Sequence, residues 1–218
     1  MSRWLIVGIS GATNSGKSTL AKKLLEILPE TTRLICQDDY FYPVDSAHHI
    51  PSPGGLNNHN WEVLSSLDMN KMIKDITETI NSIPELPVKD PVSTSVTVSL
   101  SSCLNGSVGS LPILLLEGFL LFGHSKLAEM CDLRYFLKLS REQCWQRRSC
   151  RIYDPPDPLG YFEQCVWPMH ELHLKYVKEH VPDLIFLNGK EDHSSVVYKE
   201  ILEASRTLSC KPNGHLLH

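Results

Sequence analysis

The chain has no apolar run long enough to cross a membrane. Its longest apolar stretch, residues 111–122, is interrupted by Glu117 and Gly118, whereas a membrane-spanning helix needs about 20 consecutive apolar residues. The first apolar run, residues 4–7, ends at Gly8 and is too short for the core of a signal peptide. A lipidation motif is also missing, so we expect no membrane span, no secretory leader and no membrane partner.

An excess of basic residues is equally absent. The chain has 21 Lys+Arg against 25 Asp+Glu, a formal net charge of -4, whereas general nucleic-acid binding needs a basic face. Its seven cysteines are odd in number and never spaced C-x-x-C, which argues against a disulfide framework or a zinc ribbon. We expect a cytoplasmic monomer with reduced thiols and no nucleic-acid partner.

What is present suffices for one folded domain, because the chain has 218 residues of which 42% are hydrophobic. Short apolar runs predict strands at residues 4–9, 33–36, 112–117, 135–139 and 184–187. Helical spacing predicts helices at residues 17–28, 69–80, 140–151, 169–176 and 197–208. Ser140 and Gln143 form a candidate capping box, and Met169, Leu172 and Tyr176 fall together on one helical face. Strands that alternate with helices indicate a parallel sheet.

Two segments do not follow this alternation. Residues 81–110 are rich in Ser, Thr and Pro and contain no arginine. Their alternating valines could form a strand, but we favour a surface insertion because the polar partners are all Ser or Thr. Residues 210–218 read as a tail. We therefore expect one domain over residues 1–209.

The glycine-rich segment 11–18, GATNSGKS, matches the phosphate-binding pattern G-x-x-x-x-G-K-[ST]. Glycines let consecutive N–H groups turn toward a phosphate chain, and the following helix presents its positive end to the same anion. Lys17 would reach the β- and γ-phosphates, and the Ser18 hydroxyl would bind Mg²⁺. We expect the nucleotide to be bound by Gly11, Ala12, Thr13, Asn14, Ser15, Gly16, Lys17, Ser18 and Thr19.

This motif lies between a predicted strand and an amphipathic helix, the context that a P-loop requires. The expected fold is therefore α/β, a P-loop NTPase-type three-layer sandwich with a five-stranded parallel sheet, helices on both faces and a small lid.

Acidic side chains follow two predicted strands. Asp38 and Asp39 come after the second strand, at the edge where open α/β sheets bind ligands. Asp38 could accept the proton of an attacking hydroxyl or help hold the metal, whereas Asp39 reads as structural. Glu117 ends the third strand and fits a Mg²⁺ ligand that acts through water. Gly118 would let the backbone pass close to substrate.

A basic stretch precedes a segment rich in proline. Arg147, Arg148 and Arg151 lie close together on the predicted helix and could neutralise the charge of a transferring phosphoryl group. Considered alone, these arginines would indicate only a solvent-exposed face of the helix. Before the Pro- and Gly-rich residues 154–160, they predict a lid over residues 147–162.

Weaker candidates remain. His170 and His173 have metal-ligand spacing, but no further ligands complete a zinc site. Residues 157–160 match the D-x-x-G of GTPase switches, yet they lie in a proline-rich turn and no N-K-x-D motif accompanies them. Trp61 could anchor a helix or stack on a substrate ring, a cationic ring especially well.

Several segments together carry a family resemblance. With the P-loop, QDD at 37–39, LLEGFLLF at 115–122 and RRSCRIY at 147–153, the chain resembles the nicotinamide riboside kinases, in the uridine kinase-like group of P-loop small-molecule kinases. The likeness runs from residue 5 to about residue 189 and includes WEVL at 61–64, PPD at 155–157, GYF at 160–162 and VWPM at 166–169. It lapses over residues 81–110 and beyond residue 192.

This resemblance implies ATP-dependent phosphorylation of the ribose 5′-hydroxyl of nicotinamide riboside, with nicotinic acid riboside as a second substrate and the product feeding NAD synthesis. It makes Asp38 the general base, with Lys17 as the other catalytic residue, and makes Ser18, Asp38 and Glu117 the Mg²⁺ ligands. Arg147 and Arg151 would face the nucleotide phosphates. The implied riboside-binding residues are Asp38, Asp39, Tyr40, Trp61, Glu62, Arg148, Tyr153 and Asp154, with Trp61 and Tyr153 sandwiching the pyridine ring.

Two positions depart from the family pattern. Position 62 is Glu where the family usually has Asp, and residues 190–193 differ from what the family uses near adenine, which leaves GTP as an alternative donor. A uridine or cytidine kinase of the same fold and a weakly catalytic nucleotide-binding module remain the competing hypotheses.

Overall fold

Five parallel strands form the centre of the computed structural model, which describes residues 3–82 and 111–209. The strands are β1 (Leu5–Gly11), β2 (Arg33–Cys36), β3 (Ile113–Glu117), β4 (Leu133–Lys138) and β5 (Leu184–Asn188). Their order in the sheet is β2-β3-β1-β4-β5, and every neighbouring pair is parallel. The predicted five-stranded parallel sheet is confirmed.

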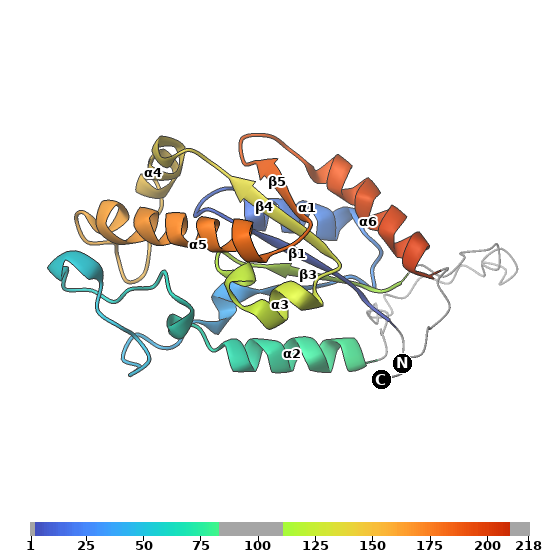
Figure 1. Cartoon of the computed structure of the whole chain (residues 1–218), viewed down its shortest axis with the longest axis horizontal. Coiled ribbons are helices and arrows are strands. Elements are labelled where there is room, and N and C mark those ends of the chain that lie inside the picture. Colours follow the sequence, from blue (N-terminus) through green and yellow to red (C-terminus); the bar gives the residue numbers. More distant parts are fainter. Residues whose placement is uncertain (1–2, 83–110, 210–218) are drawn as a thin grey trace, which may run out of the picture.

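Helices cover both faces of this sheet (Figure 1). On one face lie α1 (Lys17–Ile27) and α6 (Ser194–Ser209), and on the other lie α2 (Met69–Asn81), α3 (Ser125–Met130) and α5 (Trp167–His180). Successive side chains of a strand point to opposite faces, so Leu5, Val7 and Ile9 pack toward α1 and α6 while Ile6 packs toward α2, α3 and α5. The three-layer α/β fold is thereby established.

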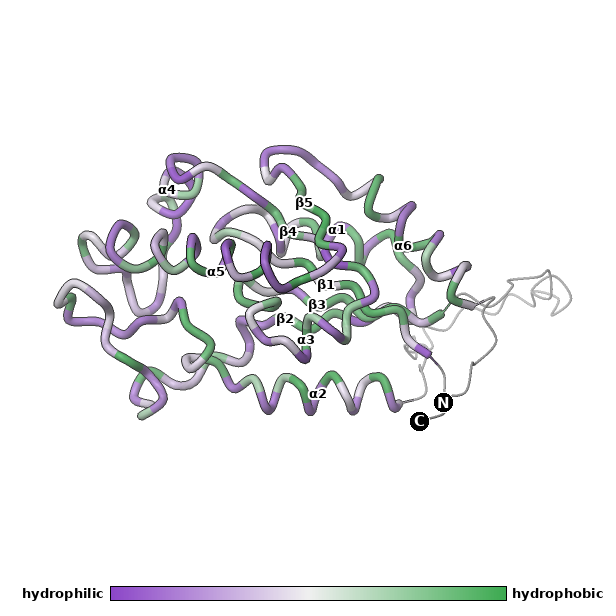
Figure 2. Tube along the Cα trace, viewed as in Figure 1, coloured by the Kyte–Doolittle hydropathy of each residue, from purple (hydrophilic) through white to green (hydrophobic). Residues whose placement is uncertain are grey.

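Local sequence explains where the helices begin. Figure 2 shows hydrophobic and hydrophilic residues alternating along α2, and the Asp68 side chain caps this helix by accepting a hydrogen bond from the Lys71 N–H. At α4 (Arg141–Ser149) both halves of the capping box between Ser140 and Gln143 are present, as predicted. This helix ends at Ser149, however, so Arg151 lies beyond it rather than on it.

The buried face of α5 differs from the one expected. His173 and Val177 are buried, whereas Leu172 is 62% exposed. Burial lowers the pKa of His173 to about 4, so the imidazole is neutral and packs beside Phe136 like an apolar ring. The spacing of apolar residues does not predict this face, because one of its two buried residues is a histidine.

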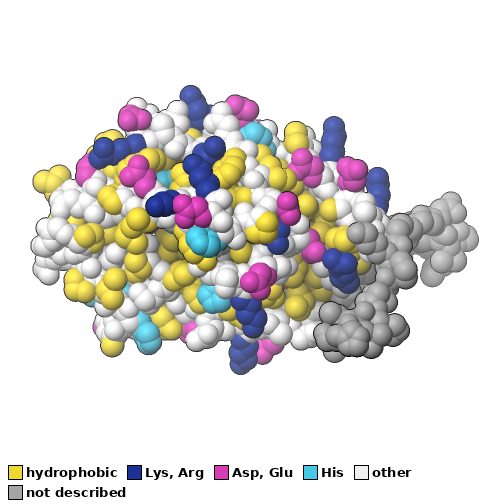
Figure 3. All heavy atoms as spheres, in the orientation of Figure 1, with side chains coloured by type: hydrophobic (Ala, Val, Ile, Leu, Met, Phe, Trp, Pro, Cys, Tyr) yellow, Lys and Arg dark blue, Asp and Glu magenta, His cyan; other side chains and the backbone are white. Residues whose placement is uncertain are grey.

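The surface of the described chain carries charges of both signs among exposed hydrophobic side chains (Figure 3). Within residues 3–82 and 111–209, no helix has the length and apolar character needed to cross a membrane. Figure 3 shows Lys, Arg, Asp and Glu side chains interspersed over one face. Residues 83–110 of the expected insertion and the tail at 210–218 lie outside the described residues.

Candidate active site

A cavity of about 660 Å³ lies where the carboxyl ends of the strands meet the loops that follow them. This volume is in the range of small-molecule sites. The predicted site residues that line it are Thr13, Asn14, Gly16, Lys17, Ser18, Thr19, Asp38, Trp61, Glu62, Glu117, Arg147, Arg148, Arg151, Tyr153 and Asp154. Residues far apart in the sequence, from the P-loop to the predicted lid, therefore share one cavity.

The P-loop connects β1 to α1 through backbone that only special residues adopt. Gly11 has φ 141°, and a Cβ there would lie 2.2 Å from the Leu137 carbonyl oxygen; Gly16 has φ 96°. Asn14 also has a positive φ, of 56°. Lys17 is only 7% exposed, and its ammonium donates a 2.9 Å hydrogen bond to the Ala12 carbonyl. The loop is thus a preformed turn that curls around a buried cation, as a phosphate site requires.

Acidic groups face this cation. Glu117, at the end of β3, is 3% exposed, and Asp38 follows β2 and opens onto the cavity. Burial lowers the pKa of Lys17, while the charges of Glu117 and Asp38 act in the opposite direction. Loss of surrounding water and then the charge of Glu117 raise the pKa of Asp38. Asp38, Glu117 and Ser18 line the same cavity and offer hard oxygen donors, which fit Mg²⁺.

A thiol also belongs to this acidic group. The Cys36 Sγ lies 3.1 Å from Glu117 Oε2 and donates to it. Burial, followed by the Glu117 charge, raises the pKa of Cys36 to about 12. This cysteine is therefore a neutral hydrogen-bond donor that orients Glu117.

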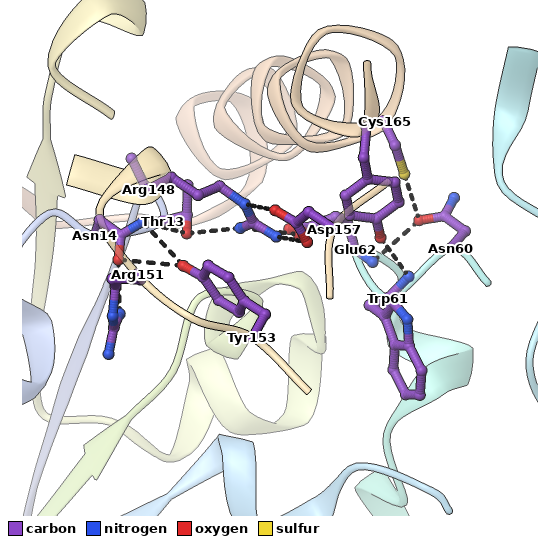
Figure 4. A network of polar contacts seen from close by, with 12 residues as sticks. Thr13, Asn14, Asn60, Trp61, Glu62, Arg148, Arg151, Tyr153, Asp157 and Cys165 are labelled. Atoms are coloured by element: carbon purple, nitrogen blue, oxygen red, sulfur yellow. Dashed lines mark hydrogen bonds and ion pairs between the residues drawn. The ribbon is translucent and has the colours of Figure 1, made fainter. Parts of the chain in front are cut away.

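Arg148 forms the centre of a buried polar network (Figure 4). Its guanidinium is bidentate to Asp157, with Nε–Oδ2 and Nη2–Oδ1 distances of 2.6 and 3.0 Å. It also donates to Thr13 Oγ1 at 3.0 Å and lies 3.5 Å from Glu62 Oε1. The Tyr153 ring stacks below it, 4.4 Å from the guanidinium carbon. Burial acts to lower the pKa of Arg148. The hydrogen bonds that Arg148 donates to Asp157, together with the charge of Glu62, outweigh burial and raise this pKa.

The other two arginines converge on Asn14 instead. Arg147 donates to the Asn14 carbonyl at 3.0 Å and to the Gly189 carbonyl at 3.1 Å. Arg151 donates to Asn14 Oδ1 at 2.6 Å, and Asn14 Nδ2 donates to the Tyr153 hydroxyl at 3.1 Å. Asn14 of the P-loop therefore contacts Arg147, Arg151 and Tyr153 of the predicted lid.

Glu62 and Trp61 enter the cavity from the segment that follows β2. Glu62 is 8% exposed, and burial raises its pKa to about 7 even though the Arg148 guanidinium acts in the opposite direction. With this pKa, Glu62 gains and loses its proton near neutral pH.

Trp61 is held through its backbone. The Trp61 N–H donates to the Tyr161 hydroxyl at 3.0 Å, and this hydroxyl donates to the His59 carbonyl.

Five predicted residues do not line this cavity: Gly11, Ala12, Ser15, Asp39 and Tyr40. The Tyr40 hydroxyl donates to Asp75 Oδ2 at 2.9 Å on α2, and its side chain is buried there. Gly118 is not among the lining residues either, although Glu117 and Phe119 are. A Cβ on Gly118 would lie 2.4 Å from the Gln37 side chain, whose amide oxygen accepts a hydrogen bond from the Leu120 N–H. The absence of a side chain at Gly118 leaves the space that the buried Gln37 side chain occupies.

Sequence reasoning did not identify seven residues that line the cavity: Phe41, Tyr42, Pro43, Val44, Phe119, Pro155 and Asp157. It also missed Tyr161, whose hydroxyl accepts a hydrogen bond from the Trp61 N–H. Asp157 holds Arg148, although its D-x-x-G context read only as an accidental match. Tyr161 joins the backbone of Trp61 to the segment beside the lid. The short motifs around both residues were visible, but their partners lie 9 and 100 residues away. As for the weak zinc candidate, the described part of the chain holds no group of three metal-ligating His, Cys, Asp or Glu side chains.

Known kinases are similar to this chain along most of its length, although no family model matches it. The chain is 37% identical over 199 residues to nicotinamide riboside kinase 1 of Rattus norvegicus, which covers 90% of this chain and 93% of that protein. It is 36% identical over 208 residues to nicotinamide riboside kinase 1 of Homo sapiens. This alignment covers 94% of this chain and 96% of that protein. A uridine kinase of Chlamydia pneumoniae is 26% identical over 193 residues, covering 86% and 84%.

Proposed function

This chain belongs to the nicotinamide riboside kinase family, and from that membership we propose how its cavity carries out the reaction. The protein is a kinase with an alcohol group as acceptor. It phosphorylates the ribose 5′-hydroxyl of nicotinamide riboside to give the mononucleotide used in NAD synthesis. We propose ATP as the donor, with GTP as an alternative, and nicotinic acid riboside as a second substrate.

The nucleotide end of the cavity would bind the triphosphate. Backbone N–H groups of residues 11–19 surround the phosphates, and the Lys17 ammonium exchanges the Ala12 carbonyl for a phosphate oxygen. Arg147 and Arg151, already held at Asn14, add positive charge from the lid side. Ser18, Asp38 and Glu117 would hold Mg²⁺, which when bound neutralises phosphate charge.

Asp38 would act as the general base. Its pKa is raised by burial and by Glu117, which makes it a stronger proton acceptor than an ordinary aspartate. It takes the proton of the 5′-hydroxyl while that oxygen bonds to the γ-phosphorus, and the bond from the γ-phosphorus to the β–γ bridging oxygen breaks to release the nucleoside diphosphate. Lys17 stabilises the charge that develops on the phosphoryl oxygens.

The riboside end of the cavity would select a charged flat ring. Trp61 and Tyr153 both line the cavity and offer aromatic faces to a pyridinium, which carries positive charge. Glu62 and Arg148, 3.5 Å apart, offer an acceptor and donors for the ribose hydroxyls. Asp154 lies in the same wall, whereas Asp39 and Tyr40 have no such position, so their proposed substrate contacts lack this support.

The observation that carries the proposal is one shared cavity, which joins the P-loop lysine, the Asp38 base and the aromatic pair. The test is a panel of nicotinamide riboside, nicotinic acid riboside, uridine and cytidine with ATP or GTP as donor. We expect the pyridine ribosides to have the highest kcat/KM with Mg²⁺–ATP. Faster transfer to uridine would overturn the substrate assignment, and binding of ATP without transfer to any riboside would favour the weakly catalytic module. Neither alternative is favoured by the 36–37% identity to the riboside kinases.

The remaining assignments are also proposals. We propose a single kinase domain over residues 1–209, with residues 147–162 as its lid. The described cysteines are all free thiols, which supports the proposed cytoplasmic location. A monomer is the proposed state, and gel filtration at several protein concentrations tests it.

A further inference from the structure

Two histidines that do not line the cavity contact Trp61. The His49 ring contacts the Trp61 indole with a centroid distance of 4.3 Å and stacks on the His59 ring at 4.8 Å. His59 and Phe41 meet the indole edge-on, at 5.8 and 5.7 Å. Phe41 and Trp61 line the cavity, whereas neither histidine does. The histidine pair therefore contacts Trp61 without belonging to the riboside site already described.

Packing, rather than a hydrogen bond, orients the indole within the described chain. The Trp61 backbone N–H is bonded to Tyr161, but the buried indole Nε1 has no hydrogen-bond partner within the described chain. Figure 4 shows the same division, since the dashed bonds reach the Trp61 backbone and none reaches its ring. The tilt of the indole therefore depends on packing, to which the rings of His49, His59 and Phe41 contribute.

The His49 imidazole is anchored to main chain, and the backbone of His59 is anchored to two neighbouring side chains. His49 Nε2 lies 2.9 Å from the Pro43 carbonyl oxygen and 3.3 Å from that of Tyr42, so it carries the proton and donates. The His59 carbonyl accepts from Ser52 Oγ at 2.8 Å, and its N–H donates to Asn58 Oδ1 at 2.9 Å. The tethered His49 ring is therefore a fixed surface against which the indole can pack.

From this arrangement we propose that His49, supported by His59, is a positioning residue that holds the Trp61 indole in the orientation that stacks on the riboside ring. The proposal rests on the proposed function, in which Trp61 takes one face of the pyridinium. His49 does not touch substrate. Its effect is to lower the cost of ordering the indole when the riboside binds, so it acts on riboside affinity rather than on the transfer step.

The test uses His49→Ala in the full chain. An aromatic contact of this kind predicts a rise of about three- to tenfold in KM for the riboside. We expect kcat and the KM for ATP to stay within about twofold, because the phosphate site is separate. The matched control is His180→Ala. His180 likewise stacks on a tyrosine, Tyr176, and bonds a main-chain carbonyl, but it lies on α5 at the other end of the helix from the lid.

Two further substitutions separate ring contact from hydrogen bonding. His49→Phe keeps the ring contact but loses the bond to the Pro43 carbonyl, so it should raise the riboside KM by less than His49→Ala does. His49→Gln keeps a donor and loses the ring, so it should behave like His49→Ala. The reverse result, with Gln retained and Phe impaired, would overturn the proposal. If His49→Ala fails to fold, the comparison of His49→Phe with His49→Gln still tests the proposal.

A double-mutant comparison ties the effect to Trp61. Trp61→Ala alone should raise the riboside KM by about tenfold or more, and His49→Ala added to it should change the KM by less than about twofold. Multiplicative effects would overturn the positioning role. A large Trp61→Ala effect with a silent His49→Ala would end this proposal and leave the proposed riboside site intact. An unchanged KM in Trp61→Ala would remove the stacking role of Trp61, and this inference with it.

Discussion

Replacement of Arg148 by lysine tests the buried network at its centre. The guanidinium makes three hydrogen bonds at once, two to Asp157 and one to Thr13, and also lies beside Glu62. A lysine ammonium keeps the positive charge, so Glu62 and Asp157 stay compensated. It cannot reproduce the planar fork that meets both oxygens of Asp157.

The size of the effect follows from the bonds that are lost. Arg148 is 7% exposed, so water does not readily replace them. Hydrogen bonds to charged groups contribute about 1.5–3 kcal/mol each. If the ammonium recovers part of this, Arg148→Lys should cost about 2–3 kcal/mol, which is roughly a 30- to 150-fold loss in kcat/KM for the riboside.

The assay is steady-state kinetics with nicotinamide riboside and ATP, alongside thermal unfolding to verify that the variant is folded. Arg147→Lys is the matched comparison, because one Nη1 of Arg147 makes both of its bonds to main-chain carbonyls. A single ammonium can do the same, so we expect a loss of less than about fivefold. A folded Arg148→Lys within about threefold of wild type would refute the reasoning.

Two further predictions follow from the charges in the cavity. Asp38→Asn should lower kcat by about 10²- to 10⁴-fold while ATP still binds, as measured by turnover and by calorimetry; near-normal turnover would remove Asp38 from the base role. For Glu62, the folded-state pKa is raised to about 7 from its ordinary 4.5, so the folded protein binds an extra proton between those values. This contribution to stability is fully present below pH 4.5 and is lost as pH rises through 7. Relative to Glu62→Gln, the wild type should therefore lose stability from pH 5 to 8 in urea unfolding, and a constant or increasing difference would contradict the assignment.

Features that depend on neighbouring residues could be predicted from the sequence. The P-loop and the Ser140–Gln143 capping box each involve residues a few positions apart, and both appear as predicted. Strand positions followed from short apolar runs bounded by turn residues. The short helix α3 was missed, since six residues carry too little periodicity for detection.

Several site residues could not have been assigned from sequence patterns. Tyr40 follows the acidic pair at 38–39, yet it turns toward Asp75 on α2. Asp157 carries no signal of its own, because its role depends on the Arg148 guanidinium that it meets across the lid. His49 and His59 carry no recognisable motif, and their contact with Trp61 arises only when the segment after β2 folds back on itself, with Pro51 paired to His59.

The sequence by itself determined the class of chemistry, because the phosphate loop and its lysine form one contiguous motif and each acid adjoins a recognisable strand. It also identified most residues of the cavity wall. Tertiary structure alone decided their partners: Arg148 on Asp157, Arg147 and Arg151 on Asn14, and the thiol of Cys36 on Glu117. The physical reason is that bonds between distant segments depend on how the sheet and the lid place them, and side-chain direction is settled only by that packing.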